Sequence, residues 1–308
     1  MSNKLRAAVV GCGSFGQNHL RVIKQSPDIE LVAAVDRDPA RGTMTDWREL
    51  AGKVDVAVVA TPTITHAEIG AVLLEAGIDI LVEKPIAATV AEADRLVETA
   101  RTHGRILQVG HLERFNPGVM ALERAVTIPL FFEIHRLSMF APRSLDVDVV
   151  LDLMIHDVDI VLALVGKLPE EVRASGVRIL SAKVDIANVR LAFPGGCIAN
   201  ITASRVSTEK VRKLRLFQPH QYISVDYTRQ EGAAFTVGDN QQIGYQPLTG
   251  EKKEPLVAQW ESFIDCVRTR RSPRVTGEQA TLALKVCSDI LDKIEEHGAV
   301  VAQTLHGV

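Results

Sequence analysis

The stretch Ala7–Gly16, AAVVGCGSFG, leads an apolar run into a group of glycines that precede an amphipathic segment. This order is typical of a strand, a tight turn and the start of a helix. In such a turn one glycine lets the chain reverse, one lets the backbone approach a diphosphate, and one lets the helix pack on its strand. The diphosphate then lies on free N–H groups at the positive end of the helix dipole. We therefore expect a dinucleotide-binding turn that contains Gly11, Gly13, Ser14, Phe15 and Gly16.

A carboxylate further along the chain strengthens this prediction, because glycine-rich turns alone are often only structural. Asp36 follows the next apolar run, residues 31–35, at the place where a ribose-binding carboxylate belongs. Its charge would repel a 2′-phosphate, which favours NAD over NADP. Arg37 leaves NADP as the alternative, because a guanidinium can pair with that phosphate as well as stack on adenine.

The composition bounds the class of protein. A length of 308 residues suggests about two domains, and 46% hydrophobic residues are enough to fill their cores. The formal charge of −3, without a long basic run, predicts neither nucleic acid nor a membrane as a partner. The apolar run behind Lys4 and Arg6 stops at Gly11, which is too short for a signal sequence, so we expect a cytoplasmic protein.

The cysteines are scattered along the chain. No C-x-x-C pair and no histidine cluster at zinc spacing occurs. We therefore predict no metal site and no disulfide, and we interpret the cysteines as reduced, mostly buried apolar residues. They are Cys12, Cys197, Cys266 and Cys287.

Residues 1–118 alternate short apolar runs with helical patterns, which predicts a doubly wound parallel sheet, a Rossmann domain that binds a dinucleotide. The last of the expected helices opens with a Thr89-x-x-Glu92 capping box and stops at Gly104. The expected strands are 7–10, 31–35, 54–60, 78–82 and 106–109, and the expected helices are 18–25, 64–76 and 89–103.

Polar or conformationally special residues follow almost every one of these strands. Because ligands bind beyond the carboxyl ends of parallel strands, these residues together predict the floor of one cofactor site. Lys84 directly follows a buried run, stands beside Glu83 and precedes Pro85, whose peptide bond is a candidate for the cis form. We therefore interpret Lys84 as directed into the site. The strand exits are residues 11–13, 36–37, 61–63, 83–85 and 111–117.

Residues 119–308 follow a different pattern, which predicts an α+β domain with a mostly antiparallel, open sheet and a long helix on one face. The turn Pro194-Gly195-Gly196 joins two strands, and two helices close the chain, the last of them able to pack back on the first domain. The expected strands are 128–140, 172–179, 188–193, 198–205, 211–218 and 222–228, and the expected helices are 146–166, 256–270 and 276–297.

The helix expected at 146–166 carries polar residues on an otherwise apolar surface. Asp148 and Asp159 fit a solvent-facing side. Asp152 and His156 stand at i and i+4, where the carboxylate can orient the imidazole as a general base near neutral pH. Spacing alone leaves a catalytic and a solvent-facing role for this pair equally open.

At this point the chain resembles the glucose-fructose oxidoreductase, inositol dehydrogenase and MocA family of NAD(P)-dependent sugar and polyol oxidoreductases. The resemblance rests on the glycine turn, on Glu83-Lys84-Pro85 and on Asp152-x-x-x-His156-Asp157. It implies that Lys84, Asp152 and His156 form the catalytic group, and that Thr61, Pro62, His66 and Glu83 line the nicotinamide half of the cofactor. The segments HLERFNP at 111–117 and DLMIHD at 152–157 look most like those of UDP-N-acetylglucosamine 3-dehydrogenases within the family.

The resemblance implies hydride transfer between a sugar carbon and nicotinamide. We expect His156 to take the hydroxyl proton, Asp152 to fix its ring, and Lys84 to stabilise the developing alkoxide. Alternatives are a free-sugar or inositol dehydrogenase, a glycosidase of the same family that uses NAD transiently, and a non-catalytic NAD-binding regulator. For a nucleotide sugar, we predict that Arg114, Arg143 and Arg205 bind the diphosphate, with Arg136 as a further candidate.

Two more expectations follow from the resemblance. A homodimer or homotetramer would form through the open face of the antiparallel sheet. The segment between Asp36 and Val54 is about a helix shorter than is usual in this family, and Gly42 interrupts it. The adenine side of the pocket is therefore either open or covered by another subunit.

Overall fold

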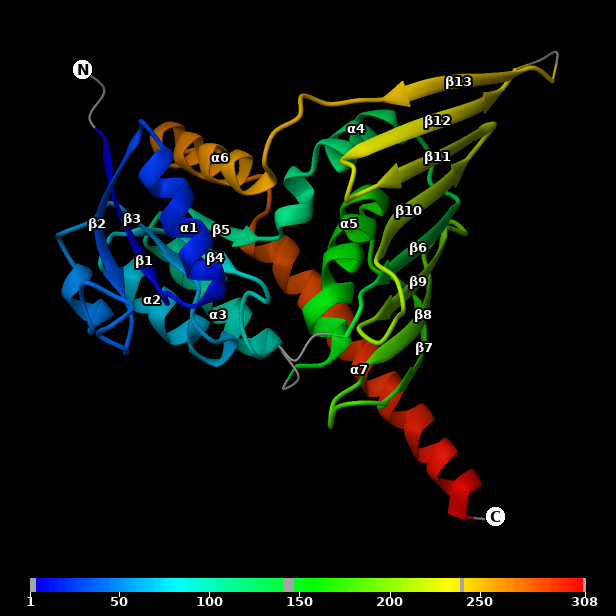
Figure 1. The fold of residues 1–308 in the computed structure, drawn as a ribbon, viewed down its shortest axis with the longest axis horizontal. Coiled ribbons are helices and arrows are strands. Elements are labelled where there is room, and N and C mark those ends of the chain that lie inside the picture. Colours follow the sequence, from blue (N-terminus) through cyan, green and yellow to red (C-terminus); the bar gives the residue numbers. More distant parts are fainter. Residues whose placement is uncertain (1–3, 141–146, 239–240, 307–308) are drawn as a thin grey trace. The chain divides into compact units, whose positions relative to one another are not determined.

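The structure is a computed structural model that describes residues 4–140, 147–238 and 241–306. The chain divides into two compact units (Figure 1). The first unit comprises residues 1–112 and 254–281, and the second comprises residues 113–253 and 282–308. The chain therefore leaves the first unit after its last strand and returns to it for residues 254–281, which hold one complete helix and the start of the last one.

The first unit is built on a five-stranded sheet with the order β2-β1-β3-β4-β5, all of whose pairs are parallel. Its central strands are buried along their whole length, because helices cover both faces of a parallel sheet. The predicted doubly wound sheet is thus confirmed. The strands are β1 (Leu5–Val10), β2 (Ile29–Val35), β3 (Val56–Val59), β4 (Asp79–Glu83) and β5 (Leu107–Gly110).

The helices of this unit are α1 (Ser14–Gln25), α2 (His66–Glu75), α3 (Val90–Thr102) and α6 (Pro255–Thr269). The predicted capping box is present, since the Thr89 hydroxyl accepts from the Glu92 N–H and the Glu92 carboxylate accepts from the Thr89 N–H. The sequence placed the start of the first helix at residue 18, which is wrong. α1 begins at Ser14, because Gly13 already serves as its N-cap.

The segment between β2 and β3 contains no α-helix, and its only helical turn is the 3₁₀ helix η1 (Trp47–Leu50). Instead, the chain folds back along β2, where Met44 bridges to Val35 and accepts a hydrogen bond from the Asp36 N–H. Gly42 makes this return possible, because a Cβ there would lie 2.7 Å from the Ala34 carbonyl oxygen. The edge of β2 is therefore covered by a short return segment.

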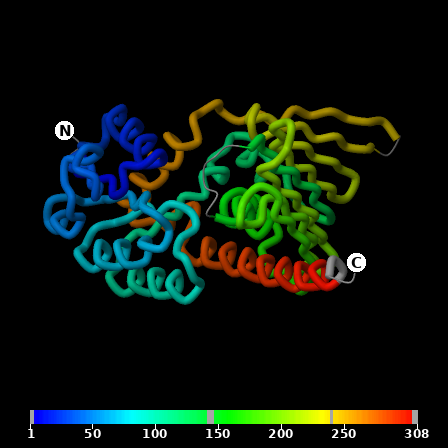
Figure 2. Tube along the Cα trace, turned by 60° about the horizontal axis from the view of Figure 1, so that its bottom comes forward, coloured from blue at the N-terminus to red at the C-terminus, as the bar shows by residue number. Residues whose placement is uncertain are grey.

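The second unit is built on an eight-stranded sheet with the order β13-β12-β11-β10-β6-β9-β8-β7. Only the β6–β9 pair is parallel; the other pairs are antiparallel. Figure 2 follows these strands along the chain. The strands are β6 (Phe131–Leu137), β7 (Glu171–Val177), β8 (Ile186–Ala192), β9 (Ile198–Ser204), β10 (Val211–Gln218), β11 (Gln221–Asp226), β12 (Glu231–Val237) and β13 (Ile243–Leu248).

Several elements of this unit differ from the sequence prediction. The strands β12 and β13 were missed, because almost every residue of β13 is exposed and the alternation that marks a half-buried strand is absent. The helix α4 (Pro117–Ala125) was also missed, although Asn116 caps it and Pro117 occupies its first turn. α7 (Gly277–His306) runs beyond the predicted end at residue 297.

The helices α4, α5 (Ile155–Val165) and the later part of α7 lie on one side of this sheet (Figure 1). Apolar residues of these helices and of the strands form one core, which includes Phe132, Met154, Phe193, Leu216 and Ile290. Along the central strands, residues that point into this core alternate with residues on the opposite face of the sheet. In β6, for example, every second residue is only half-buried. The predicted open antiparallel sheet with helices on one face is confirmed.

The helix predicted over 146–166 is not one regular helix. A π-helical turn, η4 (Val150–Met154), precedes α5, and Gly166 ends α5 in the left-handed conformation with a φ of 69°. Asp146 lies outside the described residues. Asp152 therefore lies on the π-helical turn, and His156 lies on α5. Within the described part of the chain, no helix is long and apolar enough to cross a membrane.

Candidate functional site

The glycine turn has the geometry that its sequence predicts. Gly11 has a φ of +91°, and a Cβ on it would lie 2.6 Å from the Ala60 carbonyl oxygen. A Cβ on Gly16 would lie 1.9 Å from the carbonyl oxygen of Gly11, so the close packing of α1 requires glycine there. Gly13 has open space where its side chain would be. The turn thus leaves room for a ligand to approach the backbone at Gly13.

The first turn of α1 can hold an anion. Gly13 caps the helix without a side-chain hydrogen bond, and the first turn contains no acidic residue. Its N–H groups therefore have no side-chain acceptor at the positive end of the helix dipole. Phe15, in the same turn, is 54% exposed. These features fit the diphosphate of a dinucleotide.

Asp36 lies close to the glycine turn. One carboxylate oxygen accepts the Cys12 N–H at 2.8 Å, and the other accepts the Asp38 N–H at 3.0 Å. Burial opposes ionisation, but these backbone N–H groups lower the pKa of Asp36 below its ordinary value. An ionised carboxylate retains lone pairs for further donors, so Asp36 can still accept ribose hydroxyls. Arg37 is exposed beside it.

The Glu83-Lys84-Pro85 turn follows β4, and its Lys84–Pro85 peptide bond is cis, as predicted. The Glu83 carboxylate is buried, lies 2.8 Å from Nε2 of His19 and accepts the Lys84 N–H at 3.3 Å. Burial alone would raise the pKa of Glu83, but the His19 hydrogen bond and the Lys84 charge hold it below its ordinary value. Gly110 makes room for this carboxylate, since a Cβ there would lie 2.8 Å from Oε2.

His66 joins the exits of β3 and β4. Its Nδ1 lies 2.9 Å from the Pro85 carbonyl oxygen, and its Nε2 lies 2.9 Å from the Thr61 carbonyl oxygen. The ring is buried, and burial lowers its pKa. The residues predicted to line the nicotinamide half of the cofactor therefore lie in one unit. His66 connects the loop of Thr61 and Pro62 with the turn that contains Lys84.

The second unit carries Asp152 on η4 and His156 at the start of α5. Both side chains are half-buried, and the Nδ1 atom of His156 is buried. Asp157, the next residue, is fully buried and accepts two hydrogen bonds from Arg136, at 2.6 and 2.9 Å, and one from the Tyr227 hydroxyl at 3.0 Å. A buried ion pair therefore anchors the first turn of α5 beside His156.

Arg136, proposed from sequence as a further cation for a substrate, has its partners inside the fold. Its Nη1 also donates to Glu113 at 3.0 Å, and its guanidinium lies over the Tyr227 ring at 4.9 Å. Burial opposes the charged form, but Asp157 and Glu113 raise the pKa of Arg136 well above its ordinary value. Burial and the Asp157 charge raise the pKa of Tyr227.

The other predicted cations are also buried where the structure describes them. Arg114 donates to Glu123 at 3.1 Å and lies 3.6 Å from Asp159, and Arg205 donates to the Val184 carbonyl at 2.9 Å and lies 3.3 Å from Asp185. These contacts assign both arginines a structural role, and their predicted contact with a substrate stays a prediction. Arg143 lies outside the described residues.

Two aspartates on the predicted polar stripe are not solvent-facing. Asp159 is buried beside Arg114, and Asp148 is half-buried and accepts the Val184 N–H at 2.8 Å. The interpretation of a solvated side was therefore wrong for both. The error was to read these two aspartates as solvated, although a buried carboxylate with a donor satisfies the same pattern.

Sequence reasoning missed three residues around the Glu83 carboxylate: His19, which bonds to it, Trp260, which bonds to His19, and Gly110, which leaves space for it. His19 stands three residues after Gly16 on the buried face of α1, and a histidine on such a face is a signal that could have been followed. Trp260 lies in the helix expected at 256–270, to which the sequence assigned no role in the site. Its contact with α1 depends on the return of the chain to the first unit, which no local pattern predicts.

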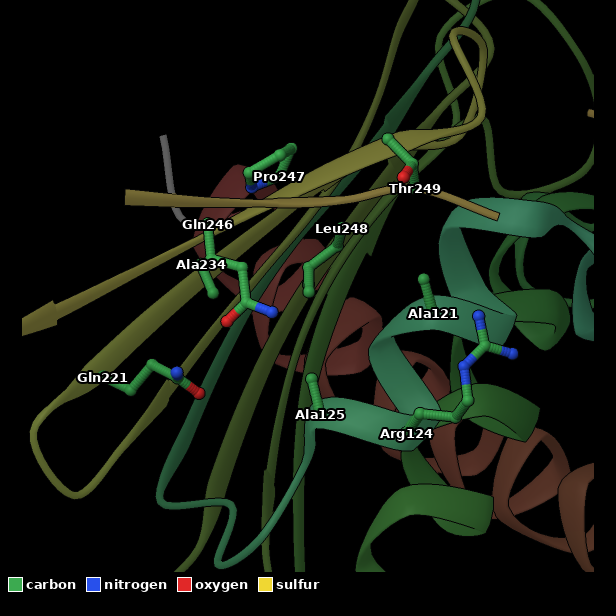
Figure 3. Close-up of a pocket in the computed structure, with 9 residues that line it drawn as sticks. All are labelled: Ala121, Arg124, Ala125, Gln221, Ala234, Gln246, Pro247, Leu248 and Thr249. Carbon is green, nitrogen blue, oxygen red and sulfur yellow. The ribbon is translucent and has the colours of Figure 1, made fainter. Parts of the chain in front are cut away.

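A pocket of about 420 Å³ lies elsewhere in the second unit, between α4 and strands β11–β13 (Figure 3). Arg124, Gln221 and Gln246 contribute its polar groups, and no predicted site residue lines it. This pocket is therefore separate from the residues predicted to carry the chemistry.

The fold and these residues define a dinucleotide-dependent oxidoreductase, and the comparisons with known proteins agree. Residues 5–111 match the GFO/IDH/MocA oxidoreductase family with its NAD-binding Rossmann fold, and residues 132–223 match the GFO/IDH/MocA C-terminal domain. The chain belongs to this family. It is a dehydrogenase that acts on CH–OH groups with a nicotinamide cofactor.

Among its relatives is the UDP-N-acetylglucosamine 3-dehydrogenase of Acidithiobacillus ferrooxidans, which is 32% identical over 283 residues and covers 87% of this chain and 90% of the relative. The solved structure of that enzyme superposes with a TM-score of 0.90 at 30% identity, covering 96% of this chain and 99% of the other. The scyllo-inositol 2-dehydrogenase of Bacillus subtilis is 26% identical over 330 residues, with 93% of each chain covered.

Proposed function

We propose that the protein oxidises the 3-hydroxyl of UDP-N-acetylglucosamine, or of a closely related nucleotide sugar, with NAD as the cofactor. The observation that carries this proposal is the similarity to the Acidithiobacillus enzyme along nearly the whole of both chains, at a TM-score of 0.90. The match extends through both units, including the second unit, where the helix with Asp152 and His156 lies.

Residues of the first unit would hold the cofactor. The turn from Gly11 to Gly16 binds the diphosphate, and Asp36 accepts the adenosine ribose hydroxyls. Asp36 stands at the ribose position as a carboxylate, which accepts the hydroxyls of an unmodified ribose but repels a 2′-phosphate, and this supports NAD over NADP. Thr61, Pro62 and Glu83 border the nicotinamide half. When bound, NAD supplies the acceptor for a hydride from the substrate carbon.

Three side chains would carry the chemistry on the substrate. His156 takes the proton of the reacting hydroxyl, and Asp152 orients the imidazole and stabilises its protonated form. Lys84 donates a hydrogen bond to the same oxygen and stabilises the negative charge that develops on it. The Arg136–Asp157 ion pair keeps the first turn of α5, and with it His156, in place.

The alternative substrate is a free polyol. The 26% identity to scyllo-inositol 2-dehydrogenase over 93% of both chains favours it. Of the two substrates, only the nucleotide sugar carries a diphosphate and therefore needs a cation to bind it. Arg143 stays a sequence-based candidate for that cation. Arg114 and Arg205 are candidates only if they give up contacts that they make inside the fold.

The test is a panel of UDP-sugars and polyols offered with NAD or NADP, with formation of the reduced cofactor as the readout. We expect NADH from UDP-N-acetylglucosamine, and competition by UDP. Turnover of inositol without any inhibition by UDP would overturn the nucleotide-sugar proposal while leaving the dehydrogenase intact. Release of a leaving sugar without net NADH would instead favour the glycosidase chemistry.

We further propose that a second copy of this chain binds the open face of the eight-stranded sheet. Opposed aromatic side chains form a continuous row there, in register from strand to strand, and Tyr245 at its end is 65% exposed. Phe217 is also exposed, and the other three rings of the row are half-buried. Contiguous apolar surface of this kind marks an interaction site. The row consists of Phe131, Phe217, Tyr222, Phe235 and Tyr245.

Light scattering of the intact chain tests this assembly. We expect a dimer or tetramer that a charge in the row, as in Tyr222→Glu, converts to a monomer. Lys213→Glu, on the same face of β10 but outside the row, is the matched control. A monomeric parent protein would contradict the proposal.

A cytoplasmic location remains part of the proposed function, because the cysteines are free and buried, as suits a reducing compartment.

A further inference from the structure

A chain of buried polar side chains leads from α6 through α1 to the turn of Lys84. The Trp260 indole donates to Nδ1 of His19 at 2.9 Å, and Nε2 of His19 lies 2.8 Å from Oε1 of Glu83. The His19 and Trp260 rings meet edge to face, with centroids 5.9 Å apart. All three residues belong to the first unit and are buried.

The chemistry of the donors fixes the direction of this chain. An indole N–H can only donate, so Nδ1 of His19 must accept, and the ring hydrogen is on Nε2. His19 therefore donates to Glu83. The other oxygen of Glu83 accepts the backbone N–H of Lys84 at 3.3 Å. One carboxylate thus connects the imidazole of α1 with the backbone of Lys84.

These polar groups are costly where they are. Trp260 belongs to an apolar cluster that includes Leu20 and Phe263, and the buried His19 and Glu83 are linked to its indole by hydrogen bonds. Burying a carboxylate and an imidazole there requires that each be hydrogen-bonded, and apolar side chains of similar volume would pack at least as well. Stability alone therefore does not account for the set.

The surroundings hold the same turn from its other side. Gly110 leaves space for the Glu83 carboxylate, which a Cβ would approach to 2.8 Å. Nδ1 of His66 lies 2.9 Å from the carbonyl oxygen of Pro85. The residues before and after Lys84 are thus both held by buried histidines.

We propose that Trp260, His19 and Glu83 form a hydrogen-bond relay that positions Lys84 for the reaction, so that these three are positioning residues of the active site. The inference rests on the proposed catalytic role of Lys84. It extends the functional set to α6, a helix far from Lys84 in sequence, and it makes an indole N–H part of that set.

The test measures steady-state turnover and NAD binding of the full-length enzyme for His19→Leu, His19→Gln and Trp260→Phe. A displaced Lys84 predicts a loss of about 10- to 100-fold in kcat for His19→Leu, and a smaller loss in the same direction for Trp260→Phe. For both variants, the KM of the sugar substrate and the dissociation constant of NAD stay unchanged. His19→Gln keeps a donor toward Glu83 and restores most of kcat.

Two further variants separate this inference from packing and from the proposed function. Phe263→Leu perturbs the same apolar cluster without removing a polar group, so it lowers the melting temperature but not kcat. In a Lys84→Met background, His19→Leu causes no additional loss of turnover, because both act on one step.

Each outcome decides one question. If Lys84→Met leaves turnover intact, the proposed function fails at Lys84. If Lys84→Met lowers turnover but His19→Leu and Trp260→Phe retain parental kcat, the relay is wrong and the catalytic lysine stands. Equal losses from Phe263→Leu and Trp260→Phe would also overturn the relay, since packing alone would then explain them. Should His19→Leu fail to fold, Trp260→Phe decides alone.

Discussion

Two buried carboxylates in this molecule stand next to the residues proposed to carry the chemistry, and they are held in different ways. Glu83 precedes Lys84 in the first unit and is held by an imidazole and a backbone N–H. Asp157 follows His156 in the second unit and is held by a fully buried guanidinium and a phenol.

The two carboxylates differ in the kind of contact that holds them. An ion pair in the interior depends on both partners, because the loss of one leaves an uncompensated charge. A carboxylate held by an imidazole and a backbone N–H depends on hydrogen bonds rather than on a guanidinium charge. The second unit therefore fixes its helix by charge, whereas the first unit fixes its turn by hydrogen bonds.

The largest effect on stability is expected from Arg136→Met. Asp157 would remain buried without its bidentate partner, and Glu113 would lose a hydrogen bond of 3.0 Å. We expect the free energy of unfolding to fall by about 3–5 kcal/mol, measured by urea denaturation. The double variant Arg136→Met with Asp157→Leu should recover much of this loss. A single variant as stable as the parent would show that the ion pair does not anchor α5.

A smaller loss is expected from Tyr227→Phe, which removes only the phenol that donates to Asp157. Hydrogen bonds to charged groups contribute about 1.5–3 kcal/mol, and a loss in this range should appear in the same denaturation experiment. Tyr222→Phe, on the open face of the sheet, is the matched control and should cost less. A reversed order of the two variants would contradict the role given to the buried phenol.

In the first unit, Glu83→Gln should change how stability depends on pH. The pKa of Glu83 is lowered in the folded protein, so the charged carboxylate adds stability above its unfolded pKa, and this contribution is lost as the pH falls through the folded pKa. The stability difference between parent and Glu83→Gln should therefore shrink below the ordinary glutamate value of 4.5. A difference that is constant from neutral to acid pH would contradict the lowered pKa.

The smallest effect on folding is expected at Asp36, a carboxylate that accepts two backbone N–H groups. Asp36→Asn should leave the melting temperature nearly unchanged but weaken NAD binding by about tenfold, since the charged acceptor for ribose hydroxyls is lost. Binding of NADP should weaken less or improve. Titration of both cofactors measures the ratio, and an unchanged ratio would remove Asp36 from cofactor selection.

Much of the fold was predictable from local signals. The central strands of the first unit are continuous buried runs, and the Thr89 capping box marks a helix start by the hydrogen bonds that it requires. The glycine turn is marked by close approaches that a Cβ would block. β12 and β13 were not predictable, because an exposed edge of a sheet shows no alternation of apolar residues. The π-helical turn before α5 was also missed, since it changes helix geometry without a change in composition.

The candidate site divides in the same way. The catalytic roles of Lys84, Asp152 and His156 follow from the family resemblance, since spacing alone left the Asp152 and His156 pair open, and they stay predictions. The partners that hold their neighbours were not predictable, because His19 and Trp260 lie far apart in sequence and meet only in the folded unit. Arg136 illustrates the opposite error, since a cation that suits a phosphate also suits a buried carboxylate.

The central claim is that His156 is the base of a nucleotide-sugar dehydrogenase. The most direct measurement is the rate of NADH formation from UDP-N-acetylglucosamine by the parent protein and by His156→Ala, with NAD affinity measured alongside. We expect the parent to turn over and the variant to lose about 10²- to 10⁴-fold in kcat with NAD binding unchanged. A variant that binds NAD and turns over at the parental rate would contradict the claim.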